Sequence, residues 1–314
     1  MNKIAFIFPG QASQYVGMAG DIYDEFDQVK ELFEKASNIL EYDLADVCFN
    51  GPEEKLTRTA YTQPAVFAHS CAMNSMLREY GFAPQAAAGH SLGEYSALVC
   101  AGALSFESAM RAIAVRSKAM QEDCDNNPGT MAAVLGLDLE RIEAVLKGIS
   151  GIVVPANLNS PGQVVIAGET AAVNDACERL KEAGAKRAMP IPVGGAYHSP
   201  LMNNSSKIVA RYINEELAIS DFDCPVYSNV SACSISDPAE YKSLLSRQIS
   251  SPVLWYPIVE NMYRDGVRSF VEIGPGKVLQ GLVKKTLKDG DAEIIGVDTL
   301  EQFDNFLKEK MVSA

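Results

Sequence analysis

The chain has 314 residues, 47% hydrophobic and 21% charged, which is typical of a soluble protein with one large domain or a large and a small one. Its formal net charge of −13 argues against nucleic acid and anionic membranes as main partners. Seven scattered cysteines indicate reduced thiols and a cytoplasmic location, three histidines argue against a multi-histidine metal site, and no apolar run reaches membrane-spanning length.

The N-terminal part predicts a strand and two helices. Residues 3–8 form a continuous apolar run, typical of a parallel strand buried on both faces, and a polar loop over residues 9–14 follows at its carboxyl end. The spacing of apolar residues predicts a helix over residues 24–40. A second helix is expected to begin near residue 62, with Pro64 at an early position, and to end near residue 80.

A short apolar run over residues 86–88 leads into Gly89-His90-Ser91-Leu92-Gly93, and a predicted helix follows. Strand, G-x-S-x-G and helix in this order indicate a nucleophile elbow, in which a sharp turn exposes a serine hydroxyl beside helix N-terminal amides. The glycines allow the turn and a close approach of strand and helix. The alternative is a serine that only caps the helix.

The next predicted helix begins after Ser105 as N-cap and carries a buried arginine. Arg116 shares a face with Ala109, Ile113 and Met120. An unpaired guanidinium there costs several kcal/mol. Its partner is either an internal Asp or Glu, or a substrate carboxylate, for which arginine offers two parallel donors.

Residues 128–193 read as a separate small domain. Strands are expected over residues 130–135, 152–156, 163–167 and 186–191, with a loop over residues 157–162, and helices over residues 138–147 and 169–183. This β-α-β-β-α-β order predicts a ferredoxin-like domain. It would be inserted into a larger domain made of residues 1–127 and 194–314.

The rest of the chain alternates strands with helices. We expect strands over residues 226–229, 267–273 and 293–297, and helices over residues 200–215, 237–249, 255–264, 277–287 and 300–308. Such alternation predicts an α/β fold with a mostly parallel sheet and helices on both faces.

A nucleophilic serine needs a base, usually histidine. His90 adjoins Ser91, but neighbours at a strand end point to opposite sides, so we expect a structural role for it. His69 lies within a predicted helix, where a core or surface position is expected. His198 lies in a glycine-rich loop at a strand end, where functional residues gather, and elimination favours it.

No acidic residue between Ser91 and His198 stands in an evident catalytic context. Asp221 and Asp223 follow His198, which is the wrong order for an α/β-hydrolase triad. A neutral acceptor also orients an imidazole, and Gln248 near a helix end is a candidate. The alternative for Gln248 is a side chain that faces solvent.

Seven motifs together resemble the malonyl-CoA:acyl-carrier-protein transacylase family, from residue 8 to past residue 285. The motifs are Phe8-Pro9-Gly10-Gln11, Gln63-Pro64-Ala65, Gly89-His90-Ser91-Leu92-Gly93-Glu94-Tyr95, Arg116, Asn159-Ser160-Pro161-Gly162-Gln163, Gly195-Ala196-Tyr197-His198-Ser199 and Gly274-Pro275-Gly276. The resemblance implies an α/β-hydrolase-like large domain, a ferredoxin-like small one, and an active site between them.

The resemblance also implies roles for single residues. Ser91 and His198 would form a catalytic dyad, and the backbone N–H groups of Gln11 and Leu92 an oxyanion hole. Arg116 would hold the free malonyl carboxylate. The remaining implied site residues are Gln248, whose main-chain carbonyl would hold the histidine ring, and Gln63, His90, Asn159 and Tyr197, which would line the cleft.

Three positions depart from the family pattern. Ala12 and Gly194 replace residues that are commonly Gly and Ser, and because both are small we expect little effect. Tyr197 stands where Phe is common, which adds a hydroxyl near the acyl pocket. Methylmalonyl is therefore the alternative acyl unit.

The implied reaction is a ping-pong transfer from malonyl-CoA to the phosphopantetheine of acyl carrier protein, by a cytoplasmic monomer without bound cofactor or metal. Because carrier proteins are acidic, a basic docking patch is expected, although these side chains could equally form a solvated face. The alternative functions are a serine thioesterase or esterase and a non-enzymatic assembly subunit. Candidate docking residues are Lys186, Arg187, Lys277, Lys284, Lys285 and Lys288.

Overall fold

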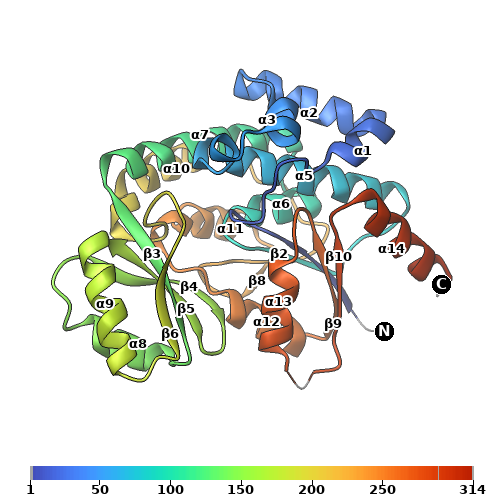
Figure 1. Ribbon diagram of the computed structural model, residues 1–314. Coiled ribbons are helices and arrows are strands. Elements are labelled where there is room, and N and C mark those ends of the chain that lie inside the picture. The colour runs from blue at the N-terminus through green and yellow to red at the C-terminus, as the bar shows by residue number, and fades with distance from the viewer. Residues whose placement is uncertain (1–2, 289, 313–314) are drawn as a thin grey trace.

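The computed structural model describes residues 3–288 and 290–312, which form two sheets with helices packed around them (Figure 1). Neighbouring strands of the larger sheet run parallel, except that the edge strand β8 is antiparallel to β7. The fold is therefore α/β with a mixed sheet. The strand order is β10 (Glu293–Val297), β9 (Val267–Ile273), β1 (Lys3–Phe8), β2 (Ala86–Gly89), β7 (Val226–Tyr227) and β8 (Ser234–Ile235).

Helices cover both faces of the larger sheet. Phe6 and Phe8 of β1 join one core with α5 (Thr59–Glu79), α6 (Gly93–Cys100) and α7 (Phe106–Asn126). Ala5 and Ile7 join the other, with α12 (Trp255–Arg264) and α13 (Val278–Thr286). Successive side chains of a strand point to opposite faces, so two buried faces require the continuous apolar run of β1.

The second sheet is antiparallel and has its own core, shared with α8 (Leu139–Leu146) and α9 (Thr170–Glu182). Its elements follow the predicted β-α-β-β-α-β order. The strand order is β4 (Val153–Ser160), β5 (Gln163–Glu169), β3 (Gly129–Leu135) and β6 (Arg187–Ile191).

The predicted loop over residues 157–162 was wrong in part, because β4 continues to Ser160 and only residues 161–162 connect it to β5. Residues 157–160 are mostly polar, which suggested a loop, but they belong to a strand that is paired on both sides. It pairs with β5, and the N–H of Leu158 also donates to the carbonyl of Val253, 2.8 Å away. This second contact joins the small sheet to the part of the chain before α12.

The observed ends of other helices also differ from the predicted ones. The helix over residues 24–40 is interrupted at Phe26, where the backbone is extended, and the helix over residues 237–249 ends at Leu245. The helices α3 and α4 and the strand β8 were not predicted. The remaining helices are α1 (Gly20–Glu25), α2 (Asp27–Leu40), α3 (Leu44–Asn50), α4 (Glu53–Leu56), α10 (Asn203–Glu215), α11 (Pro238–Leu245) and α14 (Leu300–Val312), with 3₁₀ turns at Pro200–Met202 and Gln248–Ser250.

Pro64 lies inside α5 rather than at its beginning, because the helix begins at Thr59. A proline has no N–H to donate to the carbonyl four residues earlier. Here that carbonyl belongs to Ala60, and it accepts a hydrogen bond from the Tyr42 hydroxyl at 3.4 Å. Of the helices in the described part of the chain, none has the length and hydrophobicity of a membrane span.

The carboxyl ends of β1 and β2 lie side by side, since Phe8 pairs with Gly89. A Cβ atom on Gly89 would lie 1.9 Å from the Gly93 carbonyl oxygen, and one on Gly93 would lie 2.2 Å from the Phe8 carbonyl oxygen. Only glycine permits this approach, which brings the loop after β1 against the turn after β2.

We expect Gly89→Ala to lower the free energy of unfolding by about 3 kcal/mol or more, because the new methyl group has no space. Urea unfolding followed by circular dichroism measures this. Gly281→Ala is the matched control, since a Cβ atom there meets no atom within 4 Å and the residue lies inside α13. It should stabilise the protein by about 0.5–1 kcal/mol. Equal effects of both changes would contradict the close approach.

Candidate active site

Ser91 and His198 contact one another at the carboxyl edge of the larger sheet. The Ser91 hydroxyl lies 2.8 Å from Nε2 of His198. Nδ1 of His198 lies 3.1 Å from the carbonyl oxygen of Gln248 and 3.0 Å from that of Ser251. Because carbonyls only accept hydrogen bonds, Nδ1 carries the ring proton and Nε2 accepts from Ser91. This is the geometry of a serine activated by a neutral histidine.

Three residues around this contact have left-handed backbone conformations. The φ angles are 51° at Ser91, 58° at His198 and 81° at Ala12. Such conformations cost about 1–3 kcal/mol each in residues other than glycine, and they gather at functional sites. At position 12, where the family commonly has glycine, a glycine would avoid this cost. The replacement by Ala12 therefore affects the backbone conformation as well as the side-chain size.

The environment of His198 favours its neutral form. Burial, and then the charges of Arg116 and His90, lower the pKa of His198 from its ordinary value to about 3. The imidazole is therefore free to accept a proton at neutral pH.

Two backbone amides beside Ser91 have no partner among the described residues: the N–H groups of Gln11 and Leu92. Leu92 directly precedes α6, so its amide belongs to the free N-terminal donors of that helix. The N–H of Ser91 is engaged, because it donates to Oδ1 of Asn229 at 2.6 Å. The two free amides are the groups that the family resemblance implied for an oxyanion hole.

Asn229 is a site residue that sequence reasoning missed. Its Nδ2 also donates to the carbonyl of Gly89 at 2.7 Å, so one amide braces both sides of the turn. A signal existed, since Asn229 is the last residue of the predicted strand over residues 226–229, at the sheet edge where α/β proteins build sites.

Arg116 lies on α7, only 1% exposed, with its guanidinium directed at the nucleophile. It donates to Oε1 of Gln63 at 2.7 Å, to Oε1 of Gln248 at 3.0 Å and to the Ser91 hydroxyl at 3.0 Å. No Asp or Glu of the described chain forms an ion pair with it, so the internal acidic partner was a wrong alternative. Neutral acceptors hold a charge that a substrate anion can pair with.

Gln248 is buried, and the alternative of a solvent-facing side chain is wrong. Its Nε2 donates to Oε2 of Glu94 at 2.6 Å and to the Ser91 carbonyl at 2.8 Å. Glu94 is fully buried, and burial raises the pKa of its carboxyl. The acceptors around Nε2 turn the amide so that Oε1 faces Arg116. Sequence reasoning missed Glu94 in this role, although it directly follows the G-x-S-x-G motif.

A cavity of about 180 Å³ lies over Ser91, lined by both the larger part of the chain and the small sheet. It is smaller than the roughly 300–1,000 Å³ of sites for drug-sized ligands, which suits a short acyl group. His90, Asn159 and Tyr197 line it, and Nε2 of His90 lies 2.9 Å from Oδ1 of Asn159. Gln63 does not line it but lies behind Arg116, fully buried.

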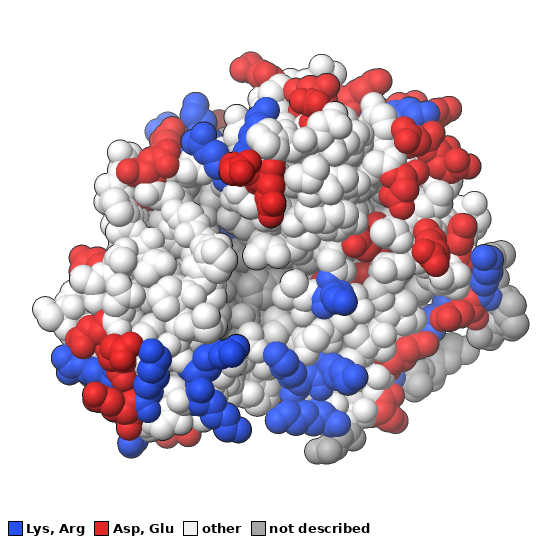
Figure 2. Space-filling view, viewed as in Figure 1, with Lys and Arg blue, Asp and Glu red and all other residues white. Residues whose placement is uncertain are grey.

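The six predicted basic residues are all exposed. Lys277, Lys284 and Lys288 border one surface hollow, and Nζ of Lys285 donates to Oε1 of Gln163 in β5 at 3.0 Å. Of these lysines, α13 contains only Lys284 and Lys285, and Lys277 and Lys288 lie just outside its ends. Figure 2 shows a run of Lys and Arg side chains along the lower edge of this face. In the described chain, no three His, Cys, Asp or Glu side chains are arranged to hold a metal ion.

Comparisons with known proteins agree over nearly the whole chain. The acyl transferase domain family matches residues 5–312. The malonyl CoA-acyl carrier protein transacylase of Bacillus subtilis (strain 168) is 43% identical over 313 residues, with 96% of this chain and 98% of that protein covered. The protein of the same name from Staphylococcus aureus (strain MRSA252) is 41% identical over 304 residues, with coverages of 96% and 97%.

Solved structures give the same result. An acyl carrier protein S-malonyltransferase from Vibrio cholerae has a TM-score of 0.91 and 42% identity, with 97% of this chain and 99% of that chain covered. PlMCAT, a malonyl-transacylase in complex with the type II PKS acyl-carrier protein AntF, has a TM-score of 0.92 and 40% identity, with coverages of 98% and 99%.

We expect a serine-directed sulfonyl fluoride to modify Ser91 at a rate that stays constant from pH 8 to pH 5. The base loses activity only as the pH falls through the pKa of His198, which is about 3. Arg116→Gln should raise this pKa, because it removes a neighbouring positive charge, and should move the decline to higher pH. Intact-protein mass spectrometry measures the rates, with Arg211→Gln as an exposed control. A decline near pH 6.5 in the unmodified protein would contradict the pKa shift.

Proposed function

Because the chain belongs to the acyl transferase domain family, we propose that its site carries malonyl from malonyl-CoA to the phosphopantetheine thiol of acyl carrier protein, through malonyl-Ser91, in fatty acid synthesis. The chain is an acyltransferase. One observation supports the proposal beyond the family: the guanidinium of Arg116, which has no acidic partner in the described part of the chain, lies 3.0 Å from the Ser91 hydroxyl inside a small cavity.

In the first half-reaction, Nε2 of His198 takes the Ser91 proton while Oγ attacks the thioester carbonyl. The oxyanion is stabilised by the amides of Gln11 and Leu92, each contributing about 3 kcal/mol as such donors do in other enzymes. The C–S bond then breaks, and the CoA thiol leaves with the proton from His198. Malonyl-Ser91 remains, with its carboxylate against Arg116.

In the second half-reaction, His198 takes the proton of the phosphopantetheine thiol, and the thiolate attacks the malonyl ester. The same two amides stabilise the oxyanion. The C–O bond breaks, and Ser91 recovers its proton from His198. No group beyond the two substrates is consumed, so the cycle needs no bound cofactor or metal.

The backbone carbonyls behind His198 favour this reading over a serine thioesterase or esterase. In a hydrolase triad a carboxylate orients the histidine and stabilises the imidazolium. Here Gln248 and Ser251 supply neutral oxygens in that place. Methylmalonyl in a polyketide pathway is the alternative acyl unit, since Tyr197 lines the cavity, with its hydroxyl 2.6 Å from that of Thr59.

The proposal includes the architecture and the partner. Residues 1–127 and 194–314 would form an α/β-hydrolase-like domain and residues 128–193 a ferredoxin-like one, which is supported by a core made only of residues from the small sheet and its helices. The outer bounds, residues 1 and 314, lie outside the described residues. The exposed run that includes Lys284 and Lys285 would receive an acidic carrier protein. We propose a cytoplasmic monomer.

Incubation with radiolabelled malonyl-CoA should place one malonyl group on the protein and none on Ser91→Ala. Because His198 activates the thiol held by the carrier protein, holo carrier protein should remove the label far faster than water does. Scintillation counting and intact mass measure both rates. Discharge by water as fast as by carrier protein would favour the hydrolase.

Arg116→Ala should lower malonyl transfer about ten- to hundredfold, because it removes a charge-assisted contact of about 1.5–3 kcal/mol. Transfer of acetyl, which has no carboxylate, should be retained or raised. Parallel assays with malonyl-CoA and acetyl-CoA measure the ratio, and Arg116→Lys, which keeps the charge, should lose less. An equal loss for both acyl groups would contradict the carboxylate contact.

A further inference from the structure

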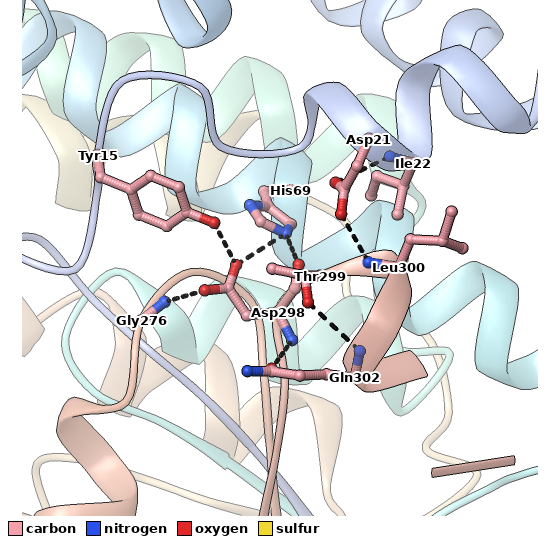
Figure 3. Close-up of polar contacts among 9 residues, drawn as sticks. All are labelled: Tyr15, Asp21, Ile22, His69, Gly276, Asp298, Thr299, Leu300 and Gln302. Atoms are coloured by element: carbon pink, nitrogen blue, oxygen red, sulfur yellow. Dashed lines mark hydrogen bonds and ion pairs between the residues drawn. The ribbon is translucent and has the colours of Figure 1, made fainter. Parts of the chain in front are cut away.

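A buried carboxylate outside the catalytic cleft joins the loops at the carboxyl edge of the larger sheet (Figure 3). Asp298 directly follows β10 and is 7% exposed. Its Oδ1 accepts a hydrogen bond from the Tyr15 hydroxyl at 3.0 Å, and its Oδ2 accepts one from the N–H of Gly276 at 2.9 Å. Tyr15 belongs to the loop after β1, and Gly276 to the loop after β9.

The backbone of Asp298 is itself held. Its carbonyl accepts from Nε2 of His69, 2.8 Å away on α5, and its N–H donates to Oε1 of Gln302 at 2.8 Å (Figure 3). Burial lowers the pKa of His69, so the ring is neutral with its proton on Nε2. Hydrogen bonds from α5 and α14 thus hold the backbone of Asp298, independently of the contacts that its carboxylate makes with the two loops.

The far end of the loop is tied to the same region. The Asp21 carboxylate accepts from the N–H of Leu300 at 2.7 Å and from the N–H of Ile22 at 2.9 Å. Asp21 lies in α1, which follows the loop after β1, and Leu300 begins α14. The segment from residue 9 to residue 16 is called the oxyanion loop below. The helix α1, which follows this loop, is therefore hydrogen-bonded to the start of α14.

Inside the oxyanion loop, contacts lead from Gly276 through Ser13 to the peptide between Gly10 and Gln11, and Tyr15 lies two residues after Ser13 in the same loop. Gly276 lies against Ser13, since a Cβ atom on it would be 3.3 Å from the Ser13 carbonyl oxygen. The Ser13 hydroxyl donates to the Gly10 carbonyl at 2.6 Å. That carbonyl and the N–H of Gln11 belong to one planar peptide group and point in opposite directions. Holding one therefore aims the other.

We propose that Asp298, through Tyr15 and Gly276, is a positioning residue that aims the Gln11 N–H at the oxyanion. The inference rests on the proposed function of that amide. The side chain of Gln11 has a second anchor, since its Nε2 donates to Thr59 and Tyr197 at 3.2 Å each, but those bonds hold the side chain rather than the peptide.

The test measures both half-reactions in Tyr15→Phe, Asp298→Asn and the double variant. Each single change should lower the rate constant at saturating malonyl-CoA by up to about tenfold, less than the 10²–10³ that loss of a whole oxyanion donor costs. KM for malonyl-CoA should stay constant. Because both half-reactions use the same amide, acylation of Ser91 and discharge to carrier protein should slow by the same factor.

The double variant should lose no more than Asp298→Asn alone, because the contact that Tyr15→Phe removes is one of those that Asp298→Asn already weakens. Tyr263→Phe is the matched control, since it removes a Tyr–Asp hydrogen bond of 2.9 Å to Asp291, away from the cleft. Unchanged rate constants, a change confined to KM, unequal effects on the two half-reactions, or an equal loss in the control would each overturn the proposal.

Hydrogen exchange separates this inference from the proposed function. Tyr15→Phe should speed amide exchange in the peptide that covers residues 9–16, and Tyr263→Phe should not. If the unmodified protein formed no malonyl-Ser91, the proposed function would fail while this measurement still decided whether Asp298 holds the loop. Unchanged exchange in Tyr15→Phe would overturn the positioning role.

Discussion

The close approach of two loops after neighbouring parallel strands is the constraint on which the site depends. Phe8 of β1 pairs with Gly89 of β2, and the glycines at positions 10 and 93 leave each backbone room against the other. The amide of Gln11 thereby lies beside the turn that carries Ser91. A side chain at either glycine would push the two loops apart and would separate the Gln11 amide from Ser91. The geometry of the candidate site therefore depends on these two glycines.

Around that turn, His198 and Arg116 form hydrogen bonds with neutral groups rather than with acidic side chains of the described chain. Backbone carbonyls orient His198, and the guanidinium of Arg116 donates hydrogen bonds to two glutamine side chains and a hydroxyl. A buried ion without a counter-ion is costly, and the network behind it, in which Glu94 turns the amide of Gln248, reduces that cost without neutralising the charge. The result is a neutral base and an available cation at one serine hydroxyl, an arrangement suited to a nucleophile that carries an anionic acyl group.

Support for the site comes from outside the cleft as well. The loop after β1 is held by Asp298, which is held in turn by α5 and α14, and the elbow is held by Asn229 from the end of β7. Residues that follow two strands, β10 and β7, thus brace the two loops at the candidate site. The relatives named as malonyl transacylases match almost the full length of the chain, including the C-terminal segment that supplies Asp298.

Most elements, the elbow, and the candidate pair Ser91 and His198 were predictable from the sequence, because apolar spacing, glycines and strand-end position are local signals. It also indicated the family. The tertiary structure was needed to show that Arg116 has no acidic partner among the described residues, that Gln248 is buried, and that β4 continues to Ser160. It was also needed to place Glu94, Asn229 and Asp298 against the loops around the site. Each of these depends on which side chains meet across long separations in the chain, and packing brings such groups together without leaving a local pattern.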